Sequence, residues 1–109
     1  MVMTVEEKVE LAQKIFQRLQ KHVQRRGSSK FSSEWSKWSM YASRRGFARA
    51  LAMAKVLRDS PSLRDEPKGQ YRVIAQVAEA LRKELEPLAP SDLADVLGYV
   101  RWMLVAEKL

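Results

Sequence analysis

The sequence predicts an all-α protein, a compact bundle of four to five helices that forms one domain over residues 1–109. Apolar residues recur at the spacing of amphipathic helices through most of the chain, and no segment alternates as a strand does. Glycine and proline fall between these periodic segments, with Gly46 and Gly98 as exceptions. A length of 109 residues suits a single hydrophobic core.

The first predicted helix covers residues 5–25. Thr4 is a good N-cap, and Glu7 completes a capping box. An apolar face comprises Val5, Val9, Ala12, Phe16, Leu19 and Val23. The opposite face is basic and carries Lys14, Arg18, Lys21 and Arg25. A polar loop over residues 25–33 follows, in which Arg26 and Lys30 add charge, and Ser32 or Ser33 is expected to cap the next helix.

The second predicted helix covers residues 34–58. Its inward face is expected to hold Met40, Ser43, Phe47, Ala50, Leu51, Ala54 and Leu57. A second basic row lies on the outer face and comprises Lys37, Arg44, Lys55 and Arg58, with Arg45 and Arg49 beside it. Gly46 costs this helix about 1 kcal/mol relative to alanine. It therefore either admits a neighbouring helix or marks a bend.

Two further helices are predicted after a long connector over residues 58–69, in which Pro67 is expected to end any short helical turn. The helix over residues 70–86 turns Ile74, Val77, Ala78, Leu81 and Leu85 inward. The helix over residues 91–108 does the same with Leu93, Val96, Leu97, Val100, Met103 and Leu104. Gly98, Trp102 and Val105 fall on its opposite side, and Trp102 there suggests either a second buried side or one exposed tryptophan.

Positive charge is concentrated in the N-terminal half. The chain has a net charge of +7, and residues 1–60 hold 13 basic and 5 acidic residues, against 7 and 8 in residues 61–109. Between Leu11 and Arg58 the only acid is Glu34. Such a one-sided block attracts polyanions, whereas a surface built for solubility alone mixes both signs.

No catalytic constellation is visible, and we expect neither enzyme activity nor a metal or cofactor. Cysteine is absent, and His22 is the only histidine, so it has no partner for a metal pair and is expected to be solvated or to contact phosphate. No dinucleotide or nucleotide-phosphate glycine loop occurs. No secretory signal or membrane span is recognisable, which favours the cytoplasm.

The basic rows suggest that the protein binds the phosphate backbone of a nucleic acid. Cations about one helical turn apart can follow successive phosphates, and the row from Lys14 to Arg25 extends about 16 Å. If the two basic helices pack antiparallel, both rows join into one surface. No reading helix is evident, so binding is expected to be largely independent of sequence, with DNA and RNA both open. Trp35, Trp38 and Tyr41 are expected in a core or subunit interface, with stacking on bases as the alternative.

Three segments together resemble a known family. They are VQRRG at residues 23–27, WSMYASRRGFARALAMAKVL at 38–57 and SDLADVLGYVRWMLVAEKL at 91–109. The chain resembles the small subunit of CRISPR effector complexes, the helical-bundle component of Cascade-type and related assemblies. The resemblance implies a non-catalytic subunit, present in several copies, that steadies target or displaced strands in a guide-RNA complex of antiviral defence. The resemblance does not assign a nucleic-acid contact to any individual residue of this chain.

Three alternatives remain open at this point. The first alternative is an adaptor whose basic face binds an acidic protein, with its tryptophans facing that partner or copies of itself. A peripheral membrane protein would use a basic amphipathic helix, but the apolar faces look committed to a core. A small DNA-binding repressor would need the reading helix that is missing.

Overall fold

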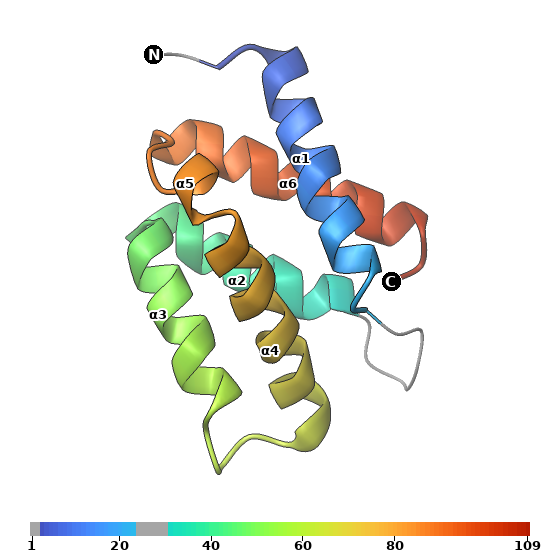
Figure 1. The fold of residues 1–109 in the computed structure, drawn as a ribbon, viewed down its shortest axis with the longest axis vertical. Coiled ribbons are helices and arrows are strands. Elements are labelled where there is room, and N and C mark those ends of the chain that lie inside the picture. The colour runs from blue at the N-terminus through green and yellow to red at the C-terminus, as the bar shows by residue number, and fades with distance from the viewer. Residues whose placement is uncertain (1–2, 24–30) are drawn as a thin grey trace.

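The computed structural model describes residues 3–23 and 31–109, and these form six helices and no strand (Figure 1). In chain order the helices are α1 (Val5–Gln20), α2 (Phe31–Arg45), α3 (Phe47–Arg58), α4 (Asp65–Ala80), α5 (Arg82–Leu85) and α6 (Pro90–Ala106). The prediction of an all-α bundle is confirmed. There are more helices than the expected four or five because two of the predicted helices are each divided.

The helices pack in pairs around one core. Helix α2 lies along α6, α3 lies beside α4, and α1 crosses α6 and also touches α4, so that α4 separates α1 from α3 (Figure 1). The inward faces predicted for the helices over residues 70–86 and 91–108 are confirmed. All of their residues are buried except Met103, which is half-buried. The largest fully buried side chains come from most of the helices and include Ile15, Trp35, Trp38, Ile74, Leu85 and Leu97.

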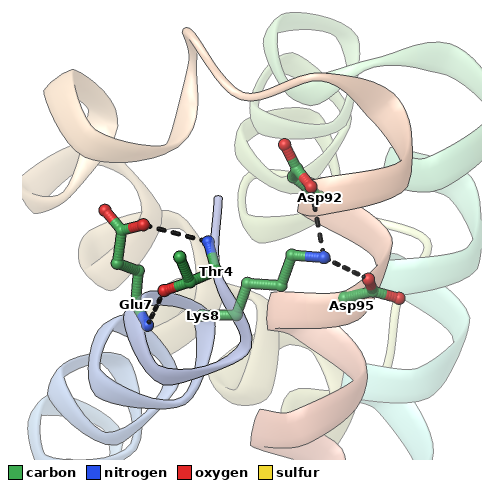
Figure 2. Close-up of polar contacts among 5 residues, drawn as sticks. All are labelled: Thr4, Glu7, Lys8, Asp92 and Asp95. Carbon is green, nitrogen blue, oxygen red and sulfur yellow. Dashed lines mark hydrogen bonds and ion pairs between the residues drawn. The ribbon is translucent and has the colours of Figure 1, made fainter. Parts of the chain in front are cut away.

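The start of α1 is fixed by polar contacts (Figure 2). The Thr4 hydroxyl accepts from the Glu7 backbone N–H at 3.1 Å, and the Glu7 carboxylate accepts from the Thr4 N–H at 2.9 Å, so the predicted capping box is confirmed. These bonds lower the pKa of Glu7 below its ordinary value. One turn further, Lys8 binds Asp95 at 2.7 Å and the buried Asp92 at 3.2 Å, which ties α1 to α6.

Helix α1 ends at Gln20, earlier than the predicted residue 25. The chain turns at Lys21 and His22, where the Leu19 carbonyl accepts from the N–H groups of both His22 and Val23. The apolar face is also shifted relative to the prediction. Val5 is exposed, because it lies at the open end of the helix, whereas Ile15 is fully buried.

The prediction of one helix over residues 34–58 is wrong, because Gly46 divides it into α2 and α3. Gly46 has φ +92°, a conformation that only glycine adopts without strain. A Cβ placed at Gly46 would meet no atom within 4 Å, so glycine is required for the bend and not for close helix packing. Its carbonyl accepts from Ala50 N–H and its N–H donates to the Ala42 carbonyl, so the two helices join directly. We call this junction the elbow.

Two tryptophans of α2 hold the elbow and the core together. Trp38 is fully buried, and its indole N–H donates to the Ala50 carbonyl of α3 at 2.8 Å. Trp35 donates to the Leu97 carbonyl of α6 at 3.1 Å, and the two rings lie 5.2 Å apart. The prediction that these aromatics belong to the core is confirmed, and their burial excludes them from stacking on bases. Tyr41 is half-buried against the same core.

The division at Gly46 also explains the misplaced Met40. Helix α2 buries Phe31, Trp35, Trp38, Ser39 and Ala42, and Met40 lies on its other side with 56 % of its surface exposed. The predicted inward face assumed one straight helix, and the elbow changes the face that α2 presents. Ser43 is half-buried, while Phe47, Ala50, Leu51 and Ala54 of α3 are buried as predicted.

Two predicted helix boundaries are also wrong. Helix α2 begins by Phe31, so Ser32 is inside the helix and neither Ser32 nor Ser33 caps it. Helix α4 begins at Asp65 and includes Pro67, which was expected to end a turn. Proline is tolerated in a first turn because the N–H that it lacks would have no partner within the helix.

The last helix ends in a defined cap. Lys108 adopts φ +59°, and Leu109 N–H donates to the Leu104 carbonyl at 2.9 Å, as in a Schellman motif. Leu109 is thereby buried, and its backbone oxygen accepts from Ser32 N–H of α2. Trp102, on the outer side of α6, is 75 % exposed, so the described residues do not bury a second side of this helix. Among the helices of the described chain, none combines the length and apolarity that a membrane span requires.

Candidate nucleic-acid interface

The basic row of α1 lies on its exposed side, next to α4 and α5. Lys14, Arg18 and Lys21 are all exposed, and Arg25 lies outside the described residues. Lys14 forms an ion pair of 2.9 Å with Glu84 of α5. The hydrogen bond from Lys14 lowers the pKa of Glu84, and the charge of Arg18 contributes in the same direction. The carboxylate of α5 therefore already offsets part of this row.

Most cations of the second predicted row are also paired. Lys37 lies 3.4 Å from Glu34, and Lys55 of α3 lies 3.6 Å from Glu79 of α4. Arg58 forms a double hydrogen bond with its neighbour Asp59, which lowers the pKa of Asp59. The two predicted rows do not join into one surface, because α4 lies between α1 and α3 and contributes the exposed Glu79.

The elbow carries three of the predicted cations that have no acidic partner among the described residues, and Arg18 and Lys21 of the first row are two others. Arg44 and Arg45 occupy the last turn of α2, and Arg49 lies in the first turn of α3. All three are exposed, and within the described part of the chain none of them forms an ion pair. We refer to them as the elbow arginines. The predicted Arg26 and Lys30 lie outside the described residues.

The dipoles of the two helices affect these arginines differently. Cations are favoured at a helix C-terminus, so Arg44 and Arg45 suit the end of α2. Arg49 sits at the start of α3, where a cation is disfavoured and where no acidic residue is present. The elbow is therefore the place where an added anion gains from both the arginines and the positive end of α3.

Sequence reasoning missed one further arginine, Arg101 of α6. Together with Arg44 it borders a groove of about 410 Å³ between α2 and α6. Arg101 was overlooked because it lies in the half of the chain with no excess of positive charge. The helical wheel offered a signal, since it placed Gly98, Trp102 and Val105 away from the core. His22 is exposed, in agreement with the expectation that it is solvated.

Comparison with known proteins gives no relative. The chain matches no protein-family model, no curated protein and no solved structure.

Proposed function

We propose that this chain is a non-catalytic protein that binds nucleic acid through its phosphate backbone, with the elbow arginines as the main contact. One observation carries the proposal: Arg44, Arg45 and Arg49 are exposed and have no carboxylate partner among the described residues. The neighbouring cations Lys37, Lys55 and Arg58 do have such partners.

The difference matters energetically. A paired cation must give up its carboxylate before it contacts a phosphate, whereas an unpaired one only releases counterions from the nucleic acid. Arginine also binds phosphate through two parallel N–H groups, which lysine cannot do. The elbow therefore provides the strongest phosphate contact among the described cations. Arg18 of α1 and Lys21, which follows that helix, are also exposed and form no ion pair among the described residues, so they offer a second contact with a single arginine.

The wider setting that we propose is a multi-subunit ribonucleoprotein complex. The resemblance to the small subunits of CRISPR effector complexes supports this setting, and in it the elbow would hold a target or displaced strand. Expression of the tagged chain in its host, followed by size fractionation, tests this part. Migration in a large particle that RNase dissociates is expected, and migration as a free small protein would contradict it.

The binding itself is tested by fluorescence anisotropy with a labelled single strand and a labelled duplex over a range of salt concentrations. The test variant changes Arg44, Arg45 and Arg49 to glutamine. The control changes three exposed arginines elsewhere, Arg64→Gln, Arg72→Gln and Arg82→Gln, and so removes the same charge. Each lost phosphate contact lowers the slope of log K against log salt by about 0.7 on a single strand and about 0.9 on a duplex.

We expect the test variant to lose about two units of this slope on a single strand, and the control variant to keep it nearly unchanged. An equal loss in both variants would mean that only the net charge matters and would reject the elbow as the contact. Absence of binding by the folded wild-type protein at low salt would reject the function.

A further inference from the structure

The groove between α2 and α6 exists because small side chains face each other where the two helices meet. On α2 these are Ser36, Ser39 and Ser43, and on α6 they are Ala94 and Gly98. The serines span about 10 Å along α2 at the rise of an α-helix. The groove is thus about two helical turns long, enough to receive side chains spaced one turn apart.

The surface beside the groove is apolar. Met40 of α2 is 56 % exposed, and Trp102 and Val105 of α6 are 75 % and 54 % exposed. Gly98, Trp102 and Val105 follow one another at spacings of four and three, so they share one face of α6. Among the described residues, most of the large hydrophobic side chains that are exposed lie here. Clusters of this kind mark interaction sites more often than scattered residues do.

The charge around the groove has one sign. Arg44 of α2 and Arg101 of α6 border it, and no acidic residue lines it. Neither arginine forms an ion pair within the described chain. An occupant that fits must therefore present apolar side chains to the groove and carboxylates to its borders.

We propose that this groove docks an acidic amphipathic helix of a partner protein. Its apolar face would lie in the groove and against Met40 and Trp102, and its flanking carboxylates would pair with Arg44 and Arg101. An amphipathic helix in a groove is a common mode of peptide recognition, and charge at the borders sets its specificity. A nucleic-acid backbone would leave the exposed apolar side chains of Met40, Trp102 and Val105 uncovered. The proposal does not depend on the nucleic-acid contact, but Arg44 belongs to both sites, so the partner helix and the nucleic acid would compete for that residue.

Gly98 provides a direct way to block the groove. A Cβ at Gly98 would meet no atom within 4 Å, so a side chain can start there, and the leucine of Gly98→Leu would extend into the groove. Gly69 of α4 has equally open space and gives a matched control, Gly69→Leu, away from the groove. Both replacements put the same residue into a helix, so they change helix propensity by a similar amount.

The probe is a designed helical peptide of about 20 residues, without tryptophan, that carries leucines on one face and glutamates beside them. A second peptide has lysine in place of every glutamate. Binding is measured by calorimetry and by acrylamide quenching of tryptophan fluorescence. Quenching reports mainly on Trp102, because Trp35 and Trp38 are buried.

We expect the acidic peptide to bind and to protect Trp102, and the basic peptide to bind at least about tenfold more weakly. Gly98→Leu should lose at least about tenfold in affinity, while Gly69→Leu binds as the wild type does. Arg101→Glu should remove most of the preference for the acidic peptide, because Arg44 remains at the other border, and the double variant Arg44→Glu with Arg101→Glu should reverse it. That reversal cannot come from a general loss of structure.

Several results would overturn the proposal. Equal binding of the two peptides would remove the charge argument, and undiminished binding by folded Gly98→Leu would remove the groove. Protection of Trp102 by an unlabelled oligonucleotide but not by the acidic peptide would assign the surface to nucleic acid. Protection that rises with protein concentration alone would assign it to a second copy of this chain.

Discussion

Trp38 is the residue on which the elbow depends, and Trp38→Phe is the sharpest test of the fold. The side chain is fully buried, and its indole N–H bonds the Ala50 carbonyl at 2.8 Å across the elbow. Phenylalanine keeps an aromatic ring in the core but removes the donor and part of the volume. The substitution therefore tests the hydrogen bond across the elbow together with the fit of the indole, while an aromatic ring stays in the core.

The expected loss can be worked out from these two terms. Truncation of a buried tryptophan to alanine costs about 3–5 kcal/mol, and the change to phenylalanine removes about a third of those atoms, hence about 1–1.5 kcal/mol. The lost hydrogen bond adds about 1 kcal/mol. This value is near the low end of the cost of an unsatisfied buried group, about 1–3 kcal/mol, because the Ala50 carbonyl remains within a helix. The total is about 2–2.5 kcal/mol, or a fall in Tm of about 8–12 °C for a domain of this size.

Urea unfolding followed by far-UV circular dichroism measures this loss without relying on the altered fluorescence. Nucleic-acid affinity should fall as well at temperatures where the variant stays folded, since Trp38 fixes the angle at which α2 and α3 present the elbow arginines. A change in the free energy of unfolding below about 0.5 kcal/mol would show that the indole bond contributes nothing and would refute the reasoning.

Four further substitutions test other parts of the structure. Gly98→Ala should raise the free energy of unfolding by about 0.5–1 kcal/mol, because a Cβ has room there and alanine favours the helix. Gly46→Ala should lower the free energy of unfolding by about 1–2 kcal/mol, because φ is +92° at this position. Urea unfolding midpoints measure both changes. Burial, helped by the nearby Glu34 carboxylate that accepts its hydrogen bond, raises the pKa of Tyr71 to about 12, above the ordinary value of 10.0. Its contribution to stability is therefore complete below pH 10 and is lost as the pH rises toward 12, so thermal melts between pH 9 and 12 should show a steeper decline in the wild type than in Tyr71→Phe. The buried Ser39 hydroxyl has no hydrogen-bond partner in the described structure, so Ser39→Ala should stabilise the protein by about 1 kcal/mol in the same urea assay, and a destabilised variant would contradict this.

The sequence was sufficient to predict the class of fold and most of the core. Periodicity placed Ile74, Leu81 and Leu97 in the interior correctly, because helical spacing alone decides which residues share a face. It failed at Gly46, where the pattern on both sides is helical and only the backbone conformation reveals the break. Met40 was misplaced for the same reason, since a helical wheel has no meaning across a bend.

The candidate site was harder to predict, because charge counted along the chain is not charge at the surface. The acids that pair with Lys14 and Lys55 are Glu84 and Glu79, which lie far away in the sequence. They belong to the half of the chain with more acids than bases, and folding brings that half against the basic one. A run of lysines and arginines in the sequence therefore overstates the positive charge that remains unpaired on that part of the surface.

The elbow arginines escape this pairing for a local reason. Arg44 and Arg45 end one helix and Arg49 begins the next, and neither the last turn of α2 nor the first turn of α3 contains an acid. For stability alone, a carboxylate near Arg49 would suit the positive end of α3 better than the arginine does. Arg49 thus goes against the preference for acids at a helix N-terminus, and no contact among the described residues compensates for this. Such exceptions on a protein surface are typical of functional positions. It is this arrangement, more than the net charge, that favours the elbow as the phosphate contact.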